Sequence, residues 1–567
     1  MINEFTIRIA GEAGQGMQTI GELLCRVFKK SGLGIFSNQD YMSRVRGGNN
    51  FFQLRVSIKP VFTLREKADI IVALDQKSHG LHKAGLKDGG IIILDKKKFN
   101  ISENDNTFFD APLYETAINS GGSDIFINTV SCGIVTAITN MEFACLSQAI
   151  KDIFADKGAD IIEKNIAAAK AGYDFANASY KKEKLKLNAP PLKSTLLMNG
   201  NQAIALGAIR AGCKFYSAYP MTPSTSIMDT VAHYAKEFNI VVEQAEDEIA
   251  AINMIIGASY AGARSMSATS GGGFALMVEG ISLAAMTETP IVVVDAQRPA
   301  PATGFPTRTE SADLDFLISA GHGEFARVVY APGTIEEAFY LTIKAFNIAE
   351  KYQIPVLIMT DQHLADSERN IEPFDLDKVR AQRYIISKED SRNITGYKRY
   401  QLTESGVSPR AIPSWIEDAI YADSDEHSEE GHIVEDGATR IKMVEKRLYK
   451  KMAGLVKEIE KPAAYNLEKA DNVLLGFGST YGVLKEACET LGESFGFAHL
   501  SQVWPFPSEE ISLLFKDKKN IITVENNASG QLARLLMRET GIKVNNSILR
   551  FDGRPFNLDD LVKRIKG

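Results

Sequence analysis

Short apolar runs alternate along most of the chain with longer amphipathic segments, and turn-forming residues separate them. A short run of β-branched and aromatic residues predicts a strand, whereas apolar residues spaced three and four apart predict a helix. In the middle of the chain these patterns predict strands at 214–218, 240–243, 265–269 and 290–295, and helices at 225–238, 249–262 and 274–287. Alternating strands and helices form a parallel sheet covered by helices, so the predicted fold class is α/β.

The first strand of this region leads into a turn with the sequence Tyr219-Pro220-Met221-Thr222-Pro223-Ser224-Thr225. Proline fixes φ and has no N–H, so the two prolines are expected to hold Met221 and Thr222 in a rigid loop. The Ser224 and Thr225 hydroxyls are predicted to cap the helix that follows. An ordinary helix start would explain the same residues, so the turn by itself leaves both interpretations open.

Further polar or flexible residues follow the other strands of this region. Glu248 begins the second helix, Gly271-Gly272-Gly273 precedes the third helix, and Arg298 follows the fourth strand. The stretch 301–313 is polar and rich in proline and threonine, as an active-site loop would be. Ligands of parallel sheets bind beyond the carboxyl ends of the strands, so these positions predict an active site at that edge.

The amino-terminal part has the pattern of half of a nucleotide-type fold. It predicts strands at 5–10, 51–57, 68–74 and 90–94, a glycine-rich loop at 11–16, a helix at 19–30 and helical segments to about 186. The glycine spacing is not G-x-G-x-x-G, which favours a tight turn over a dinucleotide site. The helix amino terminus behind the loop remains available to an anionic group.

Breaks in the pattern predict three domains, 1–187, 194–376 and 466–567, and a connecting region at 377–465. The first break is Asn188-Ala189-Pro190-Pro191, which follows a solvated Lys/Glu stretch. In the connecting region, His427 and His432 lie among carboxylates. Their spacing is not that of metal ligands, which favours a solvated loop that orders against a partner subunit. A helix is predicted at 438–459.

The last domain is predicted to contain strands at 472–477, 497–503 and 520–525, with helices from 480, at 508–515 and at 530–539. The stretch 525–531 stands at the carboxyl end of a strand. Two interpretations are open for it: contact with a cofactor or partner chain, or a helix start capped by Ser529.

Composition narrows the function classes. The 567 residues are 45% hydrophobic and 24% charged, which is typical of a soluble globular protein. The net charge of −7 offers no basic field to nucleic acid, and no apolar run approaches the roughly 18 residues of a membrane span. The start of the chain lacks the pattern of a signal peptide, which predicts a cytoplasmic protein. The five cysteines are scattered without a C-x-x-C pair, so no disulfide framework, iron–sulfur site or metal site is predicted in this chain.

Three stretches, AYPMTPST, EQAEDEIAAINMIIGASYAGARSMSATSGGG and AAMTETPIVVVDAQR, resemble the alpha subunit of 2-oxoacid:ferredoxin oxidoreductases. Two stretches near the amino terminus, GEAGQGMQTIGELL and RGG, resemble the family's gamma subunit. Arg44 and Arg46 stand just before the two glycines of RGG. The gamma loop usually reads G-x-G-G-Q-G, and Ala13 replaces one glycine here, which weakens a phosphate-binding role for the loop. The resemblance spans nearly the whole chain and implies a fused gamma–alpha polypeptide.

The resemblance implies a Rossmann-like gamma domain, a thiamine-diphosphate-binding domain of the pyrimidine type, and a domain similar to the carboxyl-terminal domain of transketolase. It also implies oxidative decarboxylation of a 2-oxo acid, with coenzyme A, to acyl-coenzyme A, CO₂ and reduced ferredoxin. The fused layout and the sequence GVSPRAIP favour 2-oxoglutarate. Pyruvate and branched-chain 2-oxo acids remain open.

A thiamine enzyme needs a carboxyl group, shielded from water, that hydrogen-bonds to the pyrimidine ring of the cofactor. The family's activating glutamate maps onto Glu248, whose helix is rich in small and apolar residues. Glu246 and Asp247 are competing candidates, since acidic residues are common in a first helical turn. The same resemblance assigns Gly271, Gly272 and Gly273 to the cofactor.

Arginine binds a carboxylate well because its planar fork matches two oxygens. Arg298 matches the family's arginine and is the first candidate for binding the substrate carboxylate, with Arg308 as the second. Thr222 matches the threonine of the family's Y-P-I-T-P motif and is expected to hydrogen-bond a substrate oxygen. Tyr219 and Pro220 are expected to line the substrate site.

Thiamine enzymes hold the diphosphate through Mg²⁺ with a G-D-G…N stretch, and no Gly-Asp-Gly occurs in this sequence. The resemblance therefore implies a beta subunit that carries the diphosphate site, Mg²⁺ and a 4Fe–4S cluster. The active site is then expected between subunits, in a hetero-tetramer of two alpha and two beta chains. Two alternatives remain: a transketolase-like or 2-oxoacid dehydrogenase component that does not use ferredoxin, and a non-catalytic assembly subunit.

Overall fold

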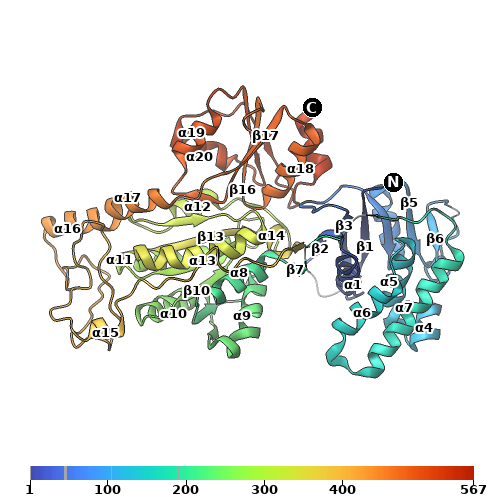
Figure 1. The fold of residues 1–567 in the computed structure, drawn as a ribbon, viewed down its shortest axis with the longest axis horizontal. Coiled ribbons are helices and arrows are strands. Elements are labelled where there is room, and N and C mark those ends of the chain that lie inside the picture. Colours follow the sequence, from blue (N-terminus) through green and yellow to red (C-terminus); the bar gives the residue numbers. More distant parts are fainter. Residues whose placement is uncertain (1, 44–46, 104, 189–190, 194) are drawn as a thin grey trace. The chain divides into compact units, whose positions relative to one another are not determined.

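The structure is a computed structural model that describes residues 2–43, 47–103, 105–188, 191–193 and 195–567 (Figure 1). The predicted positions Arg44 and Arg46, and Ala189-Pro190 of the first domain break, lie outside the described residues. The described residues divide into two compact units. One consists of Met1–Met198, Ser367–Pro373 and Asn557–Gly567, and the other of Asn199–Asp366 and Phe374–Phe556. Sheets with helices form both units, which confirms the α/β class, while the bounds of the predicted domains stay predictions.

The first unit is built on a mixed sheet with the strand order β6-β5-β4-β1-β3-β2-β14-β7. Neighbours among β1, β4, β5 and β6 are parallel, whereas the pairs made by β2, β3, β7 and β14 are antiparallel. The strands are β1 (Glu4–Ala13), β2 (Gly34–Asp40), β3 (Gly47–Ser57), β4 (Ala68–Ala73), β5 (Leu86–Leu94), β6 (Phe108–Asp110), β7 (Leu196–Met198) and β14 (Glu368–Ile371).

Strand β2 is missing from the sequence prediction because only its first residues are apolar. Its polar residues Ser37 and Asn38 are nevertheless buried, and Asn38 Nδ2 donates to Ser367 Oγ at 2.9 Å. The prediction of a glycine-rich loop at 11–16 is wrong for residues 11–13 and correct for residues 14–16. Gly11 pairs with Asn50 and Ala13 with Gly47, so strand β1 continues to Ala13 and only the remaining residues turn.

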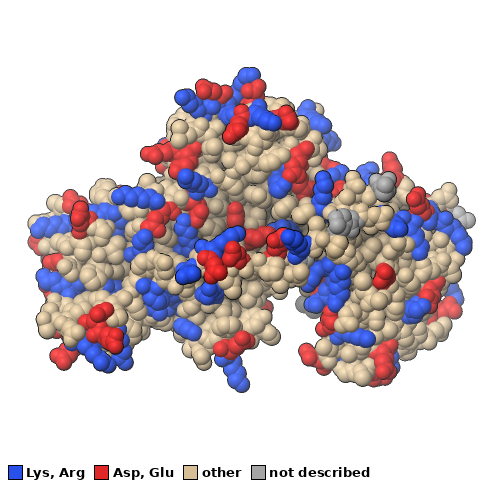
Figure 2. All heavy atoms as spheres, in the orientation of Figure 1, with Lys and Arg blue, Asp and Glu red and all other residues tan. Residues whose placement is uncertain are grey.

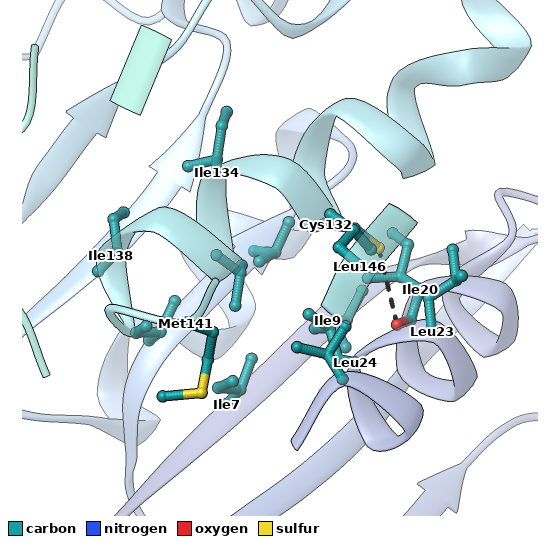
Figure 3. Close-up of a cluster of buried hydrophobic side chains, with 14 of the residues drawn as sticks. Ile7, Ile9, Ile20, Leu23, Leu24, Cys132, Ile134, Ile138, Met141 and Leu146 are labelled. Carbon is teal, nitrogen blue, oxygen red and sulfur yellow. Dashed lines mark hydrogen bonds between the residues drawn. The ribbon is translucent and has the colours of Figure 1, made fainter. Parts of the chain in front are cut away.

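An apolar core joins this sheet to its helices (Figure 3). Ile7 and Ile9 of β1 pack with Ile20, Leu23 and Leu24 of the first helix. The helices of the unit are α1 (Met17–Lys30), α2 (Gln76–His82), α3 (Lys96–Phe99), α4 (Leu113–Gly121), α5 (Ile127–Ile138), α6 (Phe143–Ile153), α7 (Ala159–Ser179) and α21 (Leu558–Lys566).

Helices α5 and α7 approach each other at two glycines. A Cβ atom on Gly133 would collide with the carbonyl oxygen of Ala169, and a Cβ atom on Gly172 would collide with that of Val130. Each helix therefore presents a glycine to the backbone of the other. Side chains at these two positions would force the helices apart.

The second unit contains the sheet that the pattern in the middle of the chain predicts. Its strand order is β18-β12-β13-β11-β10-β8-β9, and all neighbours are parallel except β18 with β12. The strands are β8 (Phe215–Ala218), β9 (Val241–Gln244), β10 (Ser265–Thr269), β11 (Ile291–Gln297), β12 (Val328–Tyr330), β13 (Pro355–Asp361) and β18 (Gln502–Trp504). Every residue of β10, β11 and β13 is buried, which explains the apolar runs of β11 and β13 and the small residues of β10.

The helices predicted at 225–238, 249–262 and 274–287 are present within three residues of their predicted bounds, whereas the other helices of this sheet were not predicted. The helices of this sheet that begin at its carboxyl edge position the candidate site. The helices of the sheet are α8 (Gly200–Arg210), α9 (Thr225–Phe238), α10 (Glu248–Tyr260), α11 (Gly271–Met286), α12 (Leu314–Ser319), α13 (Ile335–Tyr352) and α14 (Gln362–Asp366) (Figure 1).

A smaller sheet in the same unit has the order β15-β17-β16-β19-β20. Its elements are β15 (Ala463–Tyr465), β16 (Asn472–Phe477), β17 (Phe495–Leu500), β19 (Asn520–Glu525), β20 (Asn546–Leu549), α18 (Tyr481–Leu491), α19 (Ser508–Phe515) and α20 (Gln531–Thr540). The single strand predicted at 497–503 is two strands. After β17, the chain turns and β18 pairs with β12 of the larger sheet.

The connecting region folds onto the larger sheet's helices through buried ions. It contains α15 (Lys388–Ser391), α16 (Gly437–Val444), a π-helical stretch (Glu445–Lys450) and α17 (Lys451–Leu455). Lys446 and Lys451 are buried, and both form ion pairs with buried Glu288. The distance from Lys451 Nζ to Glu288 Oε2 is 2.7 Å. Burial alone would raise the pKa of Glu288, but the two ammonium groups and Arg399 outweigh it and hold that pKa well below its usual range.

The prediction of a solvated histidine loop is wrong for His427. Its side chain is fully buried against the ring of Tyr400, with the ring centroids 4.0 Å apart, and burial lowers its pKa. His432 is exposed and lies against the ring of Tyr421. Aromatic packing, which the carboxylate-rich sequence did not indicate, accounts for this loop.

Charges of both signs are interspersed on the face shown in Figure 2, in keeping with the small net charge. Within the described residues, no single helix is long and apolar enough to cross a membrane, although Leu113–Gly121 and Asp124–Ile138 reach that length and hydropathy together across a bend of 114°.

Candidate active site

The carboxyl ends of β8, β9, β10 and β11 meet at one edge of the larger sheet, because these strands are parallel neighbours. The turn 219–224 follows β8, and Glu248 begins the helix that follows β9. Gly271–Gly273 begin the helix after β10, and Arg298 directly follows β11. The fold therefore gathers at one edge the residues that the sequence analysis singled out.

Arg298 and Thr222 are in direct contact. Arg298 Nη1 donates a hydrogen bond of 2.7 Å to the carbonyl oxygen of Thr222. Arg298 is half-buried, and burial lowers its pKa. Asn201 Nδ2 supports the same turn by donating to the carbonyl oxygen of Pro223 at 2.8 Å. The turn is thus held from two sides, and Tyr219 at its start is 42% exposed.

The predicted hydroxyl caps of α9 are absent. Ser224 has helical backbone angles, and its Oγ donates backward to the carbonyl oxygen of Met221 at 2.7 Å. A capping residue needs an extended backbone for its side chain to reach the first N–H groups of the helix. The serine therefore closes the turn instead of capping the helix.

Glu248 has the burial expected of a shielded carboxyl group. Its side chain is 3% exposed, and Oε1 has no hydrogen-bond partner in the described part of the chain. The competing candidates, Glu246 and Asp247, are exposed, and Asp247 caps α10 by accepting from Ala250 N–H at 2.7 Å. A buried polar atom without a partner is costly, so Oε1 is available to a group from outside this chain.

The three glycines of α11 differ in their surroundings. A Cβ atom on Gly273 would collide with Thr269 Oγ1 and Glu248 Oε1, and one on Gly271 would collide with the carboxylate of Asp313. The nearest atom to a Cβ on Gly272 would be the carbonyl oxygen of Ala302, at 3.9 Å. Gly271 and Gly273 therefore accommodate side chains of this chain, whereas Gly272 faces more open space.

Thr269 and Met221 connect these groups into one cluster. Thr269 Oγ1 lies 3.8 Å from Met221 Sδ, between the turn that carries Thr222 and the helix that carries Gly273. The second arginine candidate is in a different setting. The side chain of Arg308 lies beside Gly553, and the neighbouring Thr309 N–H donates to the Gly553 carbonyl at 3.2 Å.

Comparison with known proteins shows the family to which this chain belongs. Family models match residues 206–446 (pyruvate flavodoxin/ferredoxin oxidoreductase, thiamine diphosphate-binding), 6–175 (pyruvate ferredoxin/flavodoxin oxidoreductase) and 470–561 (pyruvate:ferredoxin oxidoreductase core domain II). A 2-oxoacid:ferredoxin oxidoreductase subunit alpha from a Sulfolobus species is 34% identical over 98% of this chain and 95% of its own. The chain belongs to the 2-oxoacid:ferredoxin oxidoreductase family.

Other similar proteins cover part or all of the chain. The 2-oxoglutarate synthase subunit KorA of Methanocaldococcus jannaschii is 36% identical over 58% of this chain and 88% of its own. The solved 2-oxoglutarate:ferredoxin oxidoreductase of Magnetococcus marinus, with 2-oxoglutarate, coenzyme A and succinyl-CoA bound, is 31% identical. It matches 100% of this chain and 99% of its own with a TM-score of 0.92. The resemblance to the alpha subunit with a fused gamma part, and the oxidoreductase class, are therefore confirmed.

The loop 301–313 of this oxidoreductase subunit is anchored by the smaller sheet. Asn526 accepts through its carbonyl oxygen from Ser311 N–H at 2.7 Å, and Gln531 Nε2 donates to the Ala312 carbonyl at 2.6 Å. Asn527 Nδ2 also donates to the Ser311 carbonyl at 3.3 Å. The stretch 525–531 thus holds the end of the loop 301–313 in place, a role absent from the sequence analysis.

The capping role predicted for Ser529 is wrong. Asn527 Oδ1 accepts from Gly530 N–H at 2.9 Å, and Glu525 Oε2 accepts from Leu532 N–H at 2.8 Å. Both side chains are fully buried, so the helix amino terminus is satisfied from within the strand end that precedes it. Contact of 525–531 with a cofactor or partner chain stays a prediction.

Sequence reasoning also missed Asp295, Asp313 and Thr269. Asp295 follows four apolar residues in strand β11 (Ile291–Gln297), and a lone acid in such a run is a signal that was available. Asp313 gave no such signal, because it ends a polar loop. Only the fold places its carboxylate against Gly271.

Proposed function

We propose that this chain is the fused gamma–alpha subunit of an enzyme that oxidatively decarboxylates a 2-oxo acid, with 2-oxoglutarate favoured. Coenzyme A accepts the acyl group, CO₂ leaves, and the electrons reduce ferredoxin. The observation that carries this proposal is Glu248, a buried carboxyl group whose Oε1 has no partner among the described residues and lies in a cluster with Thr269 and Gly273.

Thiamine diphosphate, when bound, supplies the group that attacks the 2-oxo carbon and holds the electrons left by CO₂. The residues fit it, because Glu248 offers a dry, unpaired acid oxygen to a ring nitrogen and Gly272 leaves room at the helix start. In this proposal Glu248 holds or gives the proton of the pyrimidine ring. Gly271 and Gly273 act indirectly, by letting Asp313 and Glu248 approach α11.

Substrate binding is assigned to the turn after β8 and to Arg298. The Arg298–Thr222 hydrogen bond fixes one N–H of the guanidinium and leaves its other donors to bind a carboxylate. Thr222 would hydrogen-bond a substrate oxygen, and Tyr219 and Pro220 would line the same site. Arg308 remains the second candidate for the carboxylate, on the anchored loop.

The proposed active site also needs a beta subunit, which would carry the diphosphate site, Mg²⁺ and a 4Fe–4S cluster in a hetero-tetramer of two alpha and two beta chains. The missing Gly-Asp-Gly sequence and the dispersed cysteines of this chain support the proposal. The name of KorA and the ligands of the Magnetococcus marinus enzyme support 2-oxoglutarate as substrate. A cytoplasmic location is part of the same proposal.

The experiment is reduction of viologen or ferredoxin by the complex purified with its beta subunit. Coenzyme A and a panel of 2-oxo acids are supplied in turn: 2-oxoglutarate, pyruvate and branched-chain acids. We expect coenzyme A-dependent reduction, fastest with 2-oxoglutarate. Turnover by this chain alone, or transfer of a ketol group without any reduction, would reject the proposal.

A further inference from the structure

A buried carboxyl group, Asp295, and a half-buried one, Asp313, meet beside the candidate site, and the proposed reaction gives neither a chemical role. Asp295, on the central strand β11, is 1% exposed. Neither of its carboxylate oxygens accepts a hydrogen bond from an N–H or hydroxyl donor of the described residues. Its side chain contacts that of Asp313, at the end of the active-site loop. Burial, and then the charge of Asp313, raise the pKa of Asp295 well above its usual value.

Asp313 is held in this position by its backbone and its neighbours. Its N–H donates to Gln297 Oε1 at 2.8 Å, two residues beyond Asp295 on the same strand. Its carboxylate occupies the space that a side chain on Gly271 would need, at the first residue of α11. The same helical turn carries Gly273, against which Glu248 Oε1 lies. The carboxyl pair therefore joins three elements: strand β11, the active-site loop and the start of α11.

Electrostatics requires a proton in this contact. Two ionised carboxylates in contact and away from water repel each other, and each would also lose its hydration. One shared proton turns the repulsion into a charge-assisted hydrogen bond. The more deeply buried Asp295 is the better acid form, because the amino terminus of α11 favours a negative charge on Asp313.

We infer that Asp295 and Asp313 are positioning residues that share one proton, and that this hydrogen bond fixes the start of α11 and the end of the loop 301–313 beside Glu248. The effect of this hydrogen bond on catalysis rests on the proposed function. The shared proton itself does not depend on that function. Loss of the proton would separate the loop from the helix start and disturb the setting of Glu248.

Other titratable groups lie on the elements that surround the pair. Glu310 lies on the same loop, and burial together with the charge of Asp313 raises its pKa to about 7. Glu248 Oε1 lies against Gly273, in the first turn of α11. At the end of β13, Asp361 accepts from Ser311 Oγ at 2.9 Å, and burial lowers the pKa of the adjacent His363.

The sign of the pH effect follows from the raised pKa. An acid whose pKa is higher in the folded than in the unfolded chain adds stability at low pH, below the unfolded value of about 3.9. That stability is lost as the pH rises through the folded value. For one proton, the folding equilibrium constant falls about tenfold for each pH unit in between.

The test compares thermal unfolding of the full-length wild-type chain with that of Asp295→Asn across a series of pH values. The amide of this variant donates the same hydrogen bond to Asp313 but does not titrate. We expect its stability to fall less steeply with rising pH, by the equivalent of one proton. The difference should persist between Glu310→Gln and the double variant Asp295→Asn/Glu310→Gln, which removes the titration of Glu310 from the comparison.

Parallel pH profiles of the wild type and Asp295→Asn would overturn the inference. If Asp295→Asn does not fold, Asp313→Asn takes its place. This variant removes the charge that helps to raise the pKa of Asp295, and its amide can donate to the ionised Asp295 carboxylate. Its stability should therefore also fall less steeply with rising pH than that of the wild type, and an unchanged slope would refute the shared proton. With the beta subunit present, kcat/KM of the wild type should fall at alkaline pH, and Asp295→Asn should flatten that fall. Absence of turnover with every 2-oxo acid would count against the proposed function and leave the unfolding comparison intact.

Discussion

Glu248 Oε1 occupies the space that a side chain on Gly273 would need, so the two residues fit together only while position 273 has no Cβ atom. We expect Gly273→Ala to displace the carboxyl group and lower kcat about 100-fold, since misplacement by about 1 Å costs that much. Gly257→Ala is the control, because a Cβ atom at that position in α10 has no atom within 4 Å and Gly257 has no assigned role in the site. Viologen reduction by the complex measures both, and equal activities would contradict the assigned contact.

Glu248→Gln is expected to reduce turnover by a factor of about 100 to 10,000, the range for a lost general acid or base. The amide is nearly the same size, so the complex with the beta subunit should still assemble. Glu246→Gln, at an exposed position of the same segment, is the control and should retain activity. Size-exclusion chromatography establishes assembly alongside the rate measurement. A Glu248→Gln enzyme with near-normal turnover would refute the role of this carboxyl group.

The two arginine candidates can be separated by kinetics. Removing the side chain that binds the substrate carboxylate should raise KM for the 2-oxo acid about 10- to 100-fold, the value of a charge-assisted hydrogen bond. We expect this of Arg298→Ala, because Arg298 contacts the Thr222 carbonyl in the turn. Arg308→Ala should have the smaller effect. A larger rise in KM for Arg308→Ala would transfer the assignment to the loop.

The buried ion cluster of the connecting region predicts a large effect on stability. Glu288→Gln leaves the ammonium groups of Lys446 and Lys451 buried without their anion, which should destabilise the fold by about 3–5 kcal/mol. Glu445→Gln, at an exposed position on the neighbouring helix, should change stability by less than about 0.5 kcal/mol. Denaturant unfolding measures both changes. Similar small changes in the two variants would argue against the cluster as the anchor of this region.

The same cluster has a defined pH dependence. The pKa of Glu288 is lower in the folded than in the unfolded chain, so its contribution is present above the unfolded value of about 4.3. That contribution is lost as the pH falls through the folded value. We therefore expect Glu288→Gln to lose its disadvantage relative to the wild type in acid, as measured by unfolding at pH values below 4.

The helix crossing in the first unit gives a prediction against helix propensity. Replacing glycine by alanine inside a helix normally stabilises it by about 0.5–1 kcal/mol. Gly172→Ala should instead destabilise the protein, because its Cβ atom would meet the Val130 carbonyl. Gly80→Ala, in α2 with no atom within 4 Å of its Cβ position, should be neutral or stabilising. Thermal unfolding followed by circular dichroism compares the two, and stabilisation by Gly172→Ala would refute the close crossing.

Much of the second unit could be predicted from local patterns. Strand β10 lies at its predicted bounds, and β8, β9 and β11 lie within two residues of theirs, because each is a short segment set between helices that the sequence pattern marks clearly. The ends of these strands also placed Thr222, Glu248 and Arg298 at one edge. Strand β2 failed the same test, since the hydrogen bond of its buried Asn38 is made with Ser367, a residue distant in sequence.

The sequence by itself determined the order of the strands and helices from 214 to 298, and therefore which side chains stand at the candidate edge of the larger sheet, because periodicity and strand ends are local properties. Only the tertiary structure decided how those side chains meet. The contact of Asp295 with Asp313, the fit of Glu248 against Gly273 and the anchoring of Ser311 by Asn527 each join segments that lie apart in the chain. Such contacts depend on packing and burial across the whole unit, which no local pattern encodes.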